Sequence, residues 1–322
     1  MIDKINDLII QLKSIDTVQY DVAENIMRQI LDEFDCEIAT NTATDDVLKT
    51  TQDALEYYIT NFNLWAAYAK NYLCGAQNPK FILNDVDKQI IDRHNIRNRG
   101  TAKEIQTDNL LPTPFVGNLK TAKFVMLLKN PGLDVEDKKR INHDNWVSAV
   151  LNNLKSPLGY TDGMLFLRPN YQTFVNNTKD SGDKWWNRNI KNVKTGLNQL
   201  FASDKIYEHV ADIELFPYAS VLFGELKHNT ELVTTMSSWF FTKCLIRYVM
   251  GRGVPIFIRA GMIDFIPELQ LYKVGGKHPY AGRLFTNRNM AHISAGNLKQ
   301  VDTAKDAQTV FNELLLQIQS VK

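Results

Sequence analysis

Short apolar runs alternate with segments of helical spacing through the second part of the chain. The clearest run, at 124–128, is unbroken, lies between two lysines and is too short for an independent helix. Such a run predicts a strand that is buried on both faces, as in a parallel sheet covered by helices. Further strands are predicted at 210–215, 255–258 and 289–293, with helical segments between them. This order predicts an α/β fold with a short, mostly parallel four-stranded sheet and helices on both faces.

The first part of the chain has a different pattern. Apolar residues recur at helical spacing through 5–37, and Thr44-Asp45-Asp46 predicts the N-cap of a long helix that continues to about Leu73. We therefore predict an all-helical module at 1–95, a linker and lead-in at 96–121, and an α/β domain at 122–322. We find no catalytic pattern in the helical module.

Composition and charge narrow the class of protein. The 322 residues contain three widely separated cysteines and no CxxC pair, which disfavours a disulfide framework or a zinc site and favours a reducing compartment. No apolar run is long enough to cross a membrane, and the N-terminus does not fit a secretory signal peptide. We expect a soluble, cytoplasmic protein without a membrane partner.

The charge is unevenly distributed, although the net charge of the chain is only +1. Residues 1–60 carry 13 acidic and four basic side chains, which gives −9 and leaves +10 on residues 61–322. A polyanion such as DNA is attracted to the second part and repelled by the first. A solvated acidic helical face is the alternative explanation.

The residues that follow the predicted strands are the main candidates for chemistry. Carboxyl ends of parallel strands meet at one edge of a sheet, which is where ligands bind in open α/β folds. The sequence has no GxGxxG, GxxxxGK[ST], GxSxG or HExxH motif, so dinucleotide, P-loop, esterase and zincin chemistry are disfavoured. Taken singly, each candidate is more often a turn, a packing residue or a structural histidine, but their joint placement favours function. The candidates at this edge are Asn130, Gly132, Asp134, Glu214, Phe216, Tyr218, Arg259, His292, Ser294 and Asn297.

Two of these segments resemble motifs of a known enzyme superfamily. Asn130-Pro131-Gly132-Leu133 after a buried strand resembles the first motif of the mismatch-specific uracil/thymine-DNA glycosylases, in which the asparagine positions the attacking water. His292-Ile293-Ser294-Ala295 is similar to the second motif of the uracil-DNA glycosylase superfamily, a His or Asn followed by Pro-Ser. The sequence departs from these motifs at Ile293, where the family has proline, and at Lys129, where it has a small or apolar residue. The resemblance spans 111–318 and implies a uracil-DNA glycosylase-like fold.

Cleavage of an N-glycosidic bond suits these residue types. The sugar becomes oxocarbenium-like and the base leaves as an anion, so the site needs a positioned water and hydrogen-bond donors. Asn130 is expected to orient water through its carbonyl oxygen. If Asn130 only shapes the turn, Asp134 is the alternative, as a general base that activates the water. His292 is expected to support negative charge on the departing base.

The remaining candidates are assigned to binding. Phe216 or Tyr218 can stack on a flipped base, and Glu214 or Asn297 can read its edge. Gly132, Arg259 and Ser294 complete the expected substrate site. Basic residues beside Trp185 and Trp186 can contact the DNA backbone, although an amphipathic helix with inward tryptophans is the simpler explanation; these basic residues are Lys184, Arg188 and Lys191.

The sequence therefore predicts a DNA glycosylase that removes a uracil-like or modified base from DNA, with no metal or organic cofactor. One alternative is a non-catalytic nucleotide or nucleic-acid binding protein on the same fold. Another is a nucleoside hydrolase with Asp134 as its base.

Overall fold

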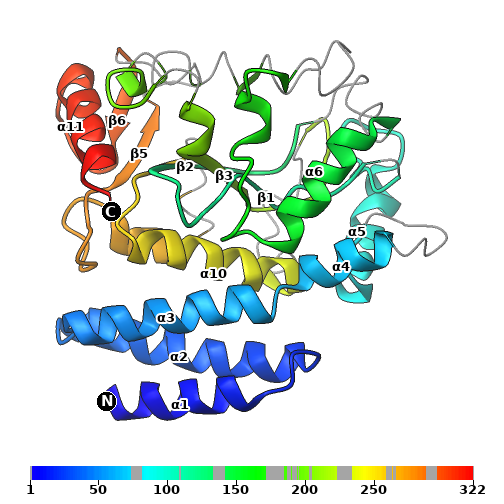
Figure 1. The fold of residues 1–322 in the computed structure, drawn as a ribbon, viewed down its shortest axis with the longest axis horizontal. Coiled ribbons are helices and arrows are strands. Elements are labelled where there is room, and N and C mark those ends of the chain that lie inside the picture. The colour runs from blue at the N-terminus through cyan, green and yellow to red at the C-terminus, as the bar shows by residue number, and fades with distance from the viewer. Residues whose placement is uncertain are drawn as a thin grey trace.

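The structure is a computed structural model in which the chain forms an α/β protein (Figure 1). In the described part of the chain, one six-stranded mixed sheet is combined with eight α-helices. The structure describes residues 2–73, 82–108, 110–132, 142–171, 185–186, 190, 194, 196–202, 205–222, 234–258, 263, 266–287 and 296–321.

The sheet has the strand order β1-β3-β2-β4-β5-β6. The four central strands, β3, β2, β4 and β5, are parallel to one another. The two outer strands are antiparallel to their partners, β1 to β3 and β6 to β5. All residues of β2, β3 and β4 are buried, as expected for strands covered on both faces. The strands are β1 (Phe115–Val116), β2 (Phe124–Leu128), β3 (Val210–Glu214), β4 (Ile256–Ile258), β5 (Leu284–Asn287) and β6 (Leu298–Gln300).

The α/β class predicted from the sequence is confirmed, but the prediction of four strands is wrong. The sheet gains one short antiparallel strand at each edge. β1 has two residues and β6 has three, which is too short for a hydrophobic period to be visible in the sequence. The predicted strand at 289–293 lies outside the described residues, and the described strand in this region, β5, ends before it.

The first helices form a layer beneath the sheet in Figure 1. Helices α1, α2 and α3 pack on one another, and α3 packs against α10, which in turn contacts β3. Helix α6 packs against β1 and α4, and α11 packs against β6. The helices are α1 (Ile2–Ser14), α2 (Tyr20–Thr40), α3 (Asp45–Asn61), α4 (Leu64–Leu73), α5 (Asp85–Asn98), α6 (Asp144–Lys155), α10 (Ser237–Gly251) and α11 (Ala307–Ser320).

The long helix predicted after Thr44 is interrupted. Thr44 is the N-cap of α3, as predicted, and its side chain accepts a hydrogen bond from the Val47 amide. The helix ends at Asn61, however, because Asn63 binds elsewhere: its Oδ1 accepts from the Trp65 amide at 3.0 Å and its Nδ2 donates to the Leu154 carbonyl at 2.7 Å. Asparagine side chains compete with helical backbone bonds in this way, so α4 begins as a separate helix.

Helix α10 joins the helical layer to the sheet. Every residue from Ser238 to Met250 except Lys243 is buried, which is typical of a helix that is covered on all sides. On the α2–α3 side, the Phe240 ring lies 4.0 Å from the Arg28 guanidinium carbon and 5.9 Å from the Tyr58 ring centroid. The helical residues and the sheet consequently share one continuous hydrophobic core.

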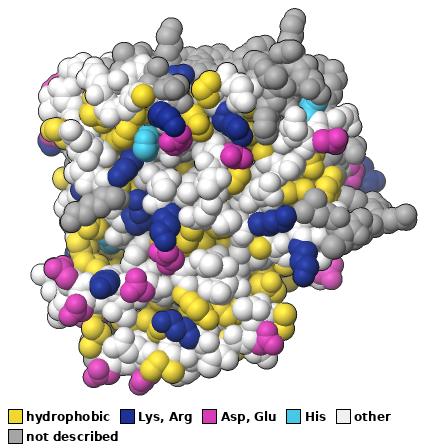
Figure 2. All heavy atoms as spheres, viewed as in Figure 1, with side chains coloured by type: hydrophobic (Ala, Val, Ile, Leu, Met, Phe, Trp, Pro, Cys, Tyr) yellow, Lys and Arg dark blue, Asp and Glu magenta, His cyan; other side chains and the backbone are white. Residues whose placement is uncertain are grey.

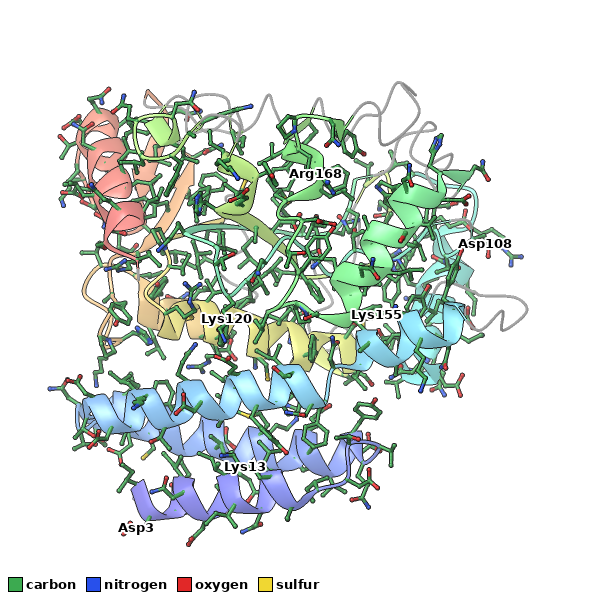
Figure 3. All side chains as sticks on the ribbon, viewed as in Figure 1. Asp3, Lys13, Asp108, Lys120, Lys155 and Arg168 are labelled. Carbon is green, nitrogen blue, oxygen red and sulfur yellow. The ribbon has the colours of Figure 1, made fainter. Side chains whose placement is uncertain are left out.

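Polar contacts reinforce this junction. The Arg247 guanidinium of α10 pairs with Asp35 of α2 at 2.5 Å, and Glu56 of α3 pairs with Lys120 at 2.5 Å. Lys120, labelled in Figure 3, lies in the segment that leads into β2. The Lys120–Glu56 pair is exposed, and an exposed pair stabilises a protein only slightly. The Arg247 side chain, by contrast, is buried, so its pair with Asp35 lies within the junction between α2 and α10.

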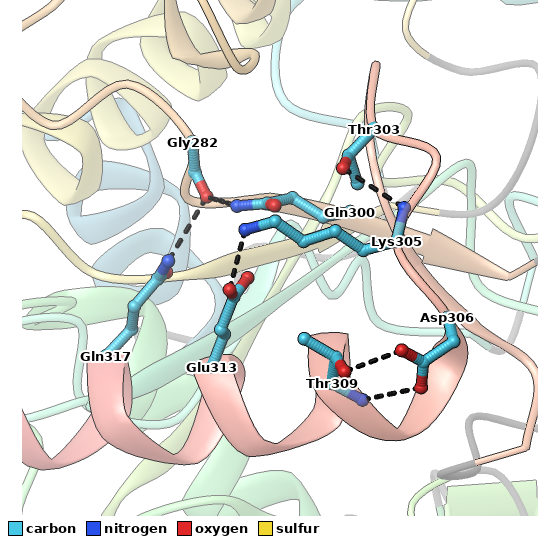
Figure 4. Close-up of polar contacts among 8 residues, drawn as sticks. All are labelled: Gly282, Gln300, Thr303, Lys305, Asp306, Thr309, Glu313 and Gln317. Carbon is cyan, nitrogen blue, oxygen red and sulfur yellow. Dashed lines mark hydrogen bonds and ion pairs between the residues drawn. The ribbon is translucent and has the colours of Figure 1, made fainter.

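The last helix is fixed by a cap and by side-chain contacts with the sheet (Figure 4). Asp306 is the N-cap of α11 and accepts hydrogen bonds from the amide and the hydroxyl of Thr309 at 3.0 and 2.6 Å. Gln317 donates to the Gly282 carbonyl, which also accepts a hydrogen bond from Gln300 of β6. These contacts fasten α11 against the turn before β5.

Acid is expected to destabilise the fold through His278. This imidazole is buried, and that burial, together with the positive charge of Arg247, lowers its pKa to about 4. Because the folded-state pKa lies below the unfolded value, stability is fully present above about pH 6.5 and is lost as the pH falls toward 4.

A His278→Asn variant tests this, because its amide oxygen can still accept the hydrogen bond from the Tyr280 amide. Between about pH 7 and about pH 4.5, we expect the unfolding free energy of the unmodified protein to fall by about 2–3 kcal/mol more than that of the variant. Urea denaturation at both pH values measures this difference. Equal losses would show that His278 is not the acid-sensitive group.

Candidate functional site

Three described candidates lie at the end of the sheet that is formed by the carboxyl ends of the parallel strands. Asn130 follows β2 and Glu214 ends β3, and these two strands are parallel neighbours. Asn297 precedes β6, which is antiparallel to β5 and pairs Leu298 with Asn287, the last residue of β5. The start of β6 therefore meets the carboxyl end of β5. Asn130, Glu214 and Asn297 thus share the edge at which the sequence predicts a site.

The side chain of Asn130 is held by its nitrogen. Nδ2 donates to Ser220 Oγ at 2.9 Å and lies 3.4 Å from the carbonyl oxygen of Tyr218. The single hydroxyl proton of Ser220 is donated to the Leu222 carbonyl at 3.0 Å, so Ser220 Oγ can only accept from Asn130. The Pro131 carbonyl oxygen lies 3.2 Å from the same nitrogen. Because all three oxygens accept hydrogen bonds, the NH2 group and not the oxygen of Asn130 must face them.

The opposite end of this amide, Asn130 Oδ1, accepts no hydrogen bond from the residues that the structure describes. The side chain is half-buried and lies at the carboxyl end of β2. A carbonyl oxygen in this position can accept a hydrogen bond from a water or a ligand.

The segment that holds Asn130 continues directly from β3. The amides of Leu215 and Phe216 donate to the carbonyls of Leu128 and Lys129 at 2.9 and 2.8 Å, which extends the pairing of β3 with β2. Gly132 and Ser220 then form an isolated parallel bridge. The turn after β2 and the segment after β3 therefore lie side by side.

The other side of this segment is covered by residues that the sequence assigns to the linker and lead-in at 96–121. Thr113 donates to the Pro217 carbonyl, Gln106 donates to the Ala219 carbonyl at 2.8 Å, and Leu222 donates to the Ala102 carbonyl at 2.7 Å. The predicted start of the linker needs correction, because α5 continues to Asn98. This region is thus an integral support of the candidate site.

Phe216 and Tyr218 are part of the core. They are 1% and 2% exposed, and their rings lie 5.3 Å apart in an edge-on arrangement. The Tyr218 hydroxyl donates to Asp87 Oδ2 of α5 at 2.7 Å, and burial raises the pKa of this phenol well above its usual range. With so little exposure, neither ring presents an open face to a base. The structure favours packing, the simpler of the two roles that the sequence allows.

The other described candidates are less informative. Glu214 is 5% exposed and Asn297 is 9% exposed, so both are buried at the edge of the sheet. An added Cβ at Gly132 would have no atom within 4 Å, and Gly132 is not among the glycines with positive φ, so the structure gives no steric reason for glycine there.

Several candidates lie outside the described residues, namely Asp134, Arg259, His292, Ser294, Lys184, Arg188 and Lys191. Near the last three, Trp186 is 4% exposed and stacks on Phe166 with ring centroids 6.4 Å apart. This agrees with the inward-facing tryptophan of an ordinary amphipathic helix.

Two residues that contact Asn130 or Tyr218 could not be predicted from any pattern in the sequence. Ser220 follows the Phe-Pro-Tyr-Ala segment, and its bond to Asn130 links residues that are 90 positions apart. Asp87 lies in the helical region and reaches Tyr218 across 131 positions. Its carboxyl group is fully buried, and this burial raises its pKa.

The described residues contain no group of three or more histidine, cysteine, aspartate or glutamate side chains arranged to hold a metal ion. Among the described helices, none combines the length and the apolar character that crossing a membrane requires.

Surface charge follows the division seen in the sequence. Figure 2 shows lysine and arginine side chains spread over the part of this face above the sheet, with acidic side chains between them, whereas acidic side chains prevail over α1–α3.

Comparison of the chain with protein-family models, with curated proteins and with solved structures found no match. Its function therefore has to be inferred from the side chains at the edge of the sheet.

Proposed function

We propose that the protein is a DNA glycosylase, with a uracil-DNA glycosylase-like fold, that hydrolyses the N-glycosidic bond of a uracil-like or modified base flipped out of DNA. The observation that carries the proposal is the orientation of Asn130 at the carboxyl end of β2. Its amide nitrogen lies within hydrogen-bond distance of oxygen atoms of Pro131, Tyr218 and Ser220, so its carbonyl oxygen is the end left to accept a hydrogen bond from water.

This orientation is what a water-positioning amide needs. A carboxamide cannot take up a proton at neutral pH, but its oxygen can accept a hydrogen bond and direct the lone pair of a water toward the sugar. A water held in this way attacks the oxocarbenium-like carbon once the bond to the base has lengthened. Asn130 thus acts by position and not as a base.

The departing base needs support on its other side. In the proposal, His292 stabilises the negative charge on the departing nucleobase, and Glu214 or Asn297 forms hydrogen bonds with the edge of that nucleobase. Asp134 is the alternative to Asn130, as a general base that activates the water. The place of Glu214 and Asn297 in the sheet supports this role, because both lie at the same end of the strands as Asn130. The excess of basic residues after position 60 supports DNA as the partner.

The proposal is tested by incubating the purified protein with duplex and single-stranded DNA that contains uracil, mismatched thymine or a modified cytosine. Alkali-labile strand breaks at the marked base are the expected result. DNA binding without breaks on every substrate would favour the non-catalytic alternative. Base release from free nucleosides that long DNA does not inhibit, and that is insensitive to salt, would favour the nucleoside hydrolase.

Removal of the Ser220 hydroxyl is expected to slow base release without weakening DNA binding. Ser220→Ala removes the shortest hydrogen bond of the Asn130 amide but leaves the Tyr218 carbonyl in place. We expect a rate reduction of roughly tenfold, because the amide loses its fixed orientation. Single-turnover kinetics measure this effect.

Ser320→Ala is the matched control, since this hydroxyl lies at the exposed end of α11 and bonds to the Gln317 carbonyl. The control should retain the full rate. Equal rates for both variants would mean that Ser220 does not orient Asn130.

A further inference from the structure

We infer that helix α5 positions the catalytic asparagine, and that Asp87 is the positioning residue through which it acts. The inference rests on the proposed function of Asn130. It assigns a role in the reaction to the helical region, in which the sequence shows no catalytic pattern.

The first link runs from Asp87 to the segment that holds Asn130. Asp87 Oδ2 accepts the Tyr218 hydroxyl proton at 2.7 Å, and the Leu83 amide donates to the same hydroxyl oxygen at 3.1 Å. The phenol is thus fixed by one donor and one acceptor. The carbonyl of Tyr218 lies 3.4 Å from Asn130 Nδ2, so the same residue joins α5 to the candidate catalytic amide.

A second set of hydrogen bonds connects α5 to the same segment, two helical turns after Asp87. Asn95 bonds to Ile105 in both directions, because its Nδ2 donates to the Ile105 carbonyl at 2.8 Å and its Oδ1 accepts from the Ile105 amide at 2.9 Å. The next residue, Gln106, donates to the carbonyl of Ala219. Ala219 lies between Tyr218 and Ser220, so α5 supports both sides of the Asn130 contact.

Asp87 also contacts the first turn of α10. Its Oδ1 lies 3.5 Å from the Ser238 amide, at a helix N-terminus, where a carboxylate is favoured. The Asp87 side chain is completely buried, and the ring of Trp65 lies 6.3 Å from the ring of its partner Tyr218. A short, rigid carboxylate in this position leaves the tyrosine little freedom to move.

A purely structural role for Asp87 predicts a different result from a positioning role. Loss of structural support lowers the melting temperature but leaves the rate per folded molecule unchanged. Loss of positioning lowers the rate constant for base release while DNA affinity and KM stay near their original values. The difference is measured well below the melting temperature.

The variants are Asp87→Asn, Tyr218→Phe and the combination of the two. Tyr218→Phe removes only the hydroxyl group, so the ring packing is kept. Asp87→Asn leaves one acceptor oxygen for two donors, the Tyr218 hydroxyl and the Ser238 amide. Each single variant is expected to lower the single-turnover rate roughly tenfold, and the double variant no more than that, because both changes weaken the same contact. Asp92→Asn is the matched control, because Asp92 is a carboxylate on α5 that pairs with Lys88. It should retain the full rate.

A second measurement does not depend on activity. In protein labelled with isotopic asparagine, the side-chain amide signal of Asn130, assigned by its loss in Asn130→Ala, is expected to shift in Asp87→Asn and Tyr218→Phe but not in Asp92→Asn. An unshifted signal in both variants would overturn the inference. Shifted signals in a protein that releases no base would support the positioning of Asn130 and would overturn the proposed function instead.

Discussion

Replacement of Asn130 by alanine is expected to reduce base release by roughly 100-fold or more while the protein remains folded. The side chain is half-buried and, among the described residues, bonds only to the Ser220 hydroxyl and to backbone carbonyls, so its loss costs little stability. The rate falls because the attacking water loses the acceptor that directs it, and misplacement of a reactant by about 1 Å is enough for a loss of this size. Single-turnover kinetics with excess protein measure the chemical step directly.

Asn118→Ala is the matched control. Asn118 precedes β2, at the opposite end of the strand from Asn130, and its Oδ1 accepts hydrogen bonds from the amides of Lys120 and Thr121. Its loss should lower stability by about 1 kcal/mol, as for other lost turn bonds, and leave the rate unchanged. An active Asn130→Ala protein would remove the amide from the mechanism.

Deletion of residues 1–63 is expected to prevent the rest of the chain from folding. The deletion removes α1, α2 and α3 and exposes the side of α10 that packs on them. Each large apolar side chain that loses its cover costs about 1.5–3 kcal/mol, so a few such residues on α10 cancel a typical total stability of about 5–15 kcal/mol.

Expression of 64–322 beside the full chain tests this expectation. We expect aggregation, or a circular dichroism spectrum without cooperative melting, for the shortened protein. A soluble fragment that melts cooperatively and releases base would show that the α/β part is an independent domain. That result would also contradict the single continuous core.

The elements that could be predicted from the sequence are those whose signal is local. The unbroken apolar run of β2 identified that strand to the residue. Thr44 identified the start of α3, because a capping side chain acts within three residues. The edge strands β1 and β6 could not be predicted, because two or three residues are too few to show a hydrophobic period.

The site was predictable to the same extent. Parallel strand direction predicts that Asn130 and Glu214 lie at the same end of neighbouring strands, and β2 and β3 are parallel. Asn297 reaches this end differently, because it precedes β6, which is antiparallel to β5. The partners Ser220 and Asp87 could not be found in this way, because a serine in a loop and an aspartate on a helix have no distinctive spacing. Their roles come from tertiary contacts with Asn130 and Tyr218.

The central claim is that a water held by Asn130 displaces a base from DNA. Its most direct test is mass spectrometry of the products after incubation with uracil-containing, mismatched and modified DNA in heavy-oxygen water. The account predicts an unlabelled free base and a heavy oxygen atom on the anomeric carbon of the abasic sugar. Intact DNA on every substrate, or a base that itself carries the label, would contradict it.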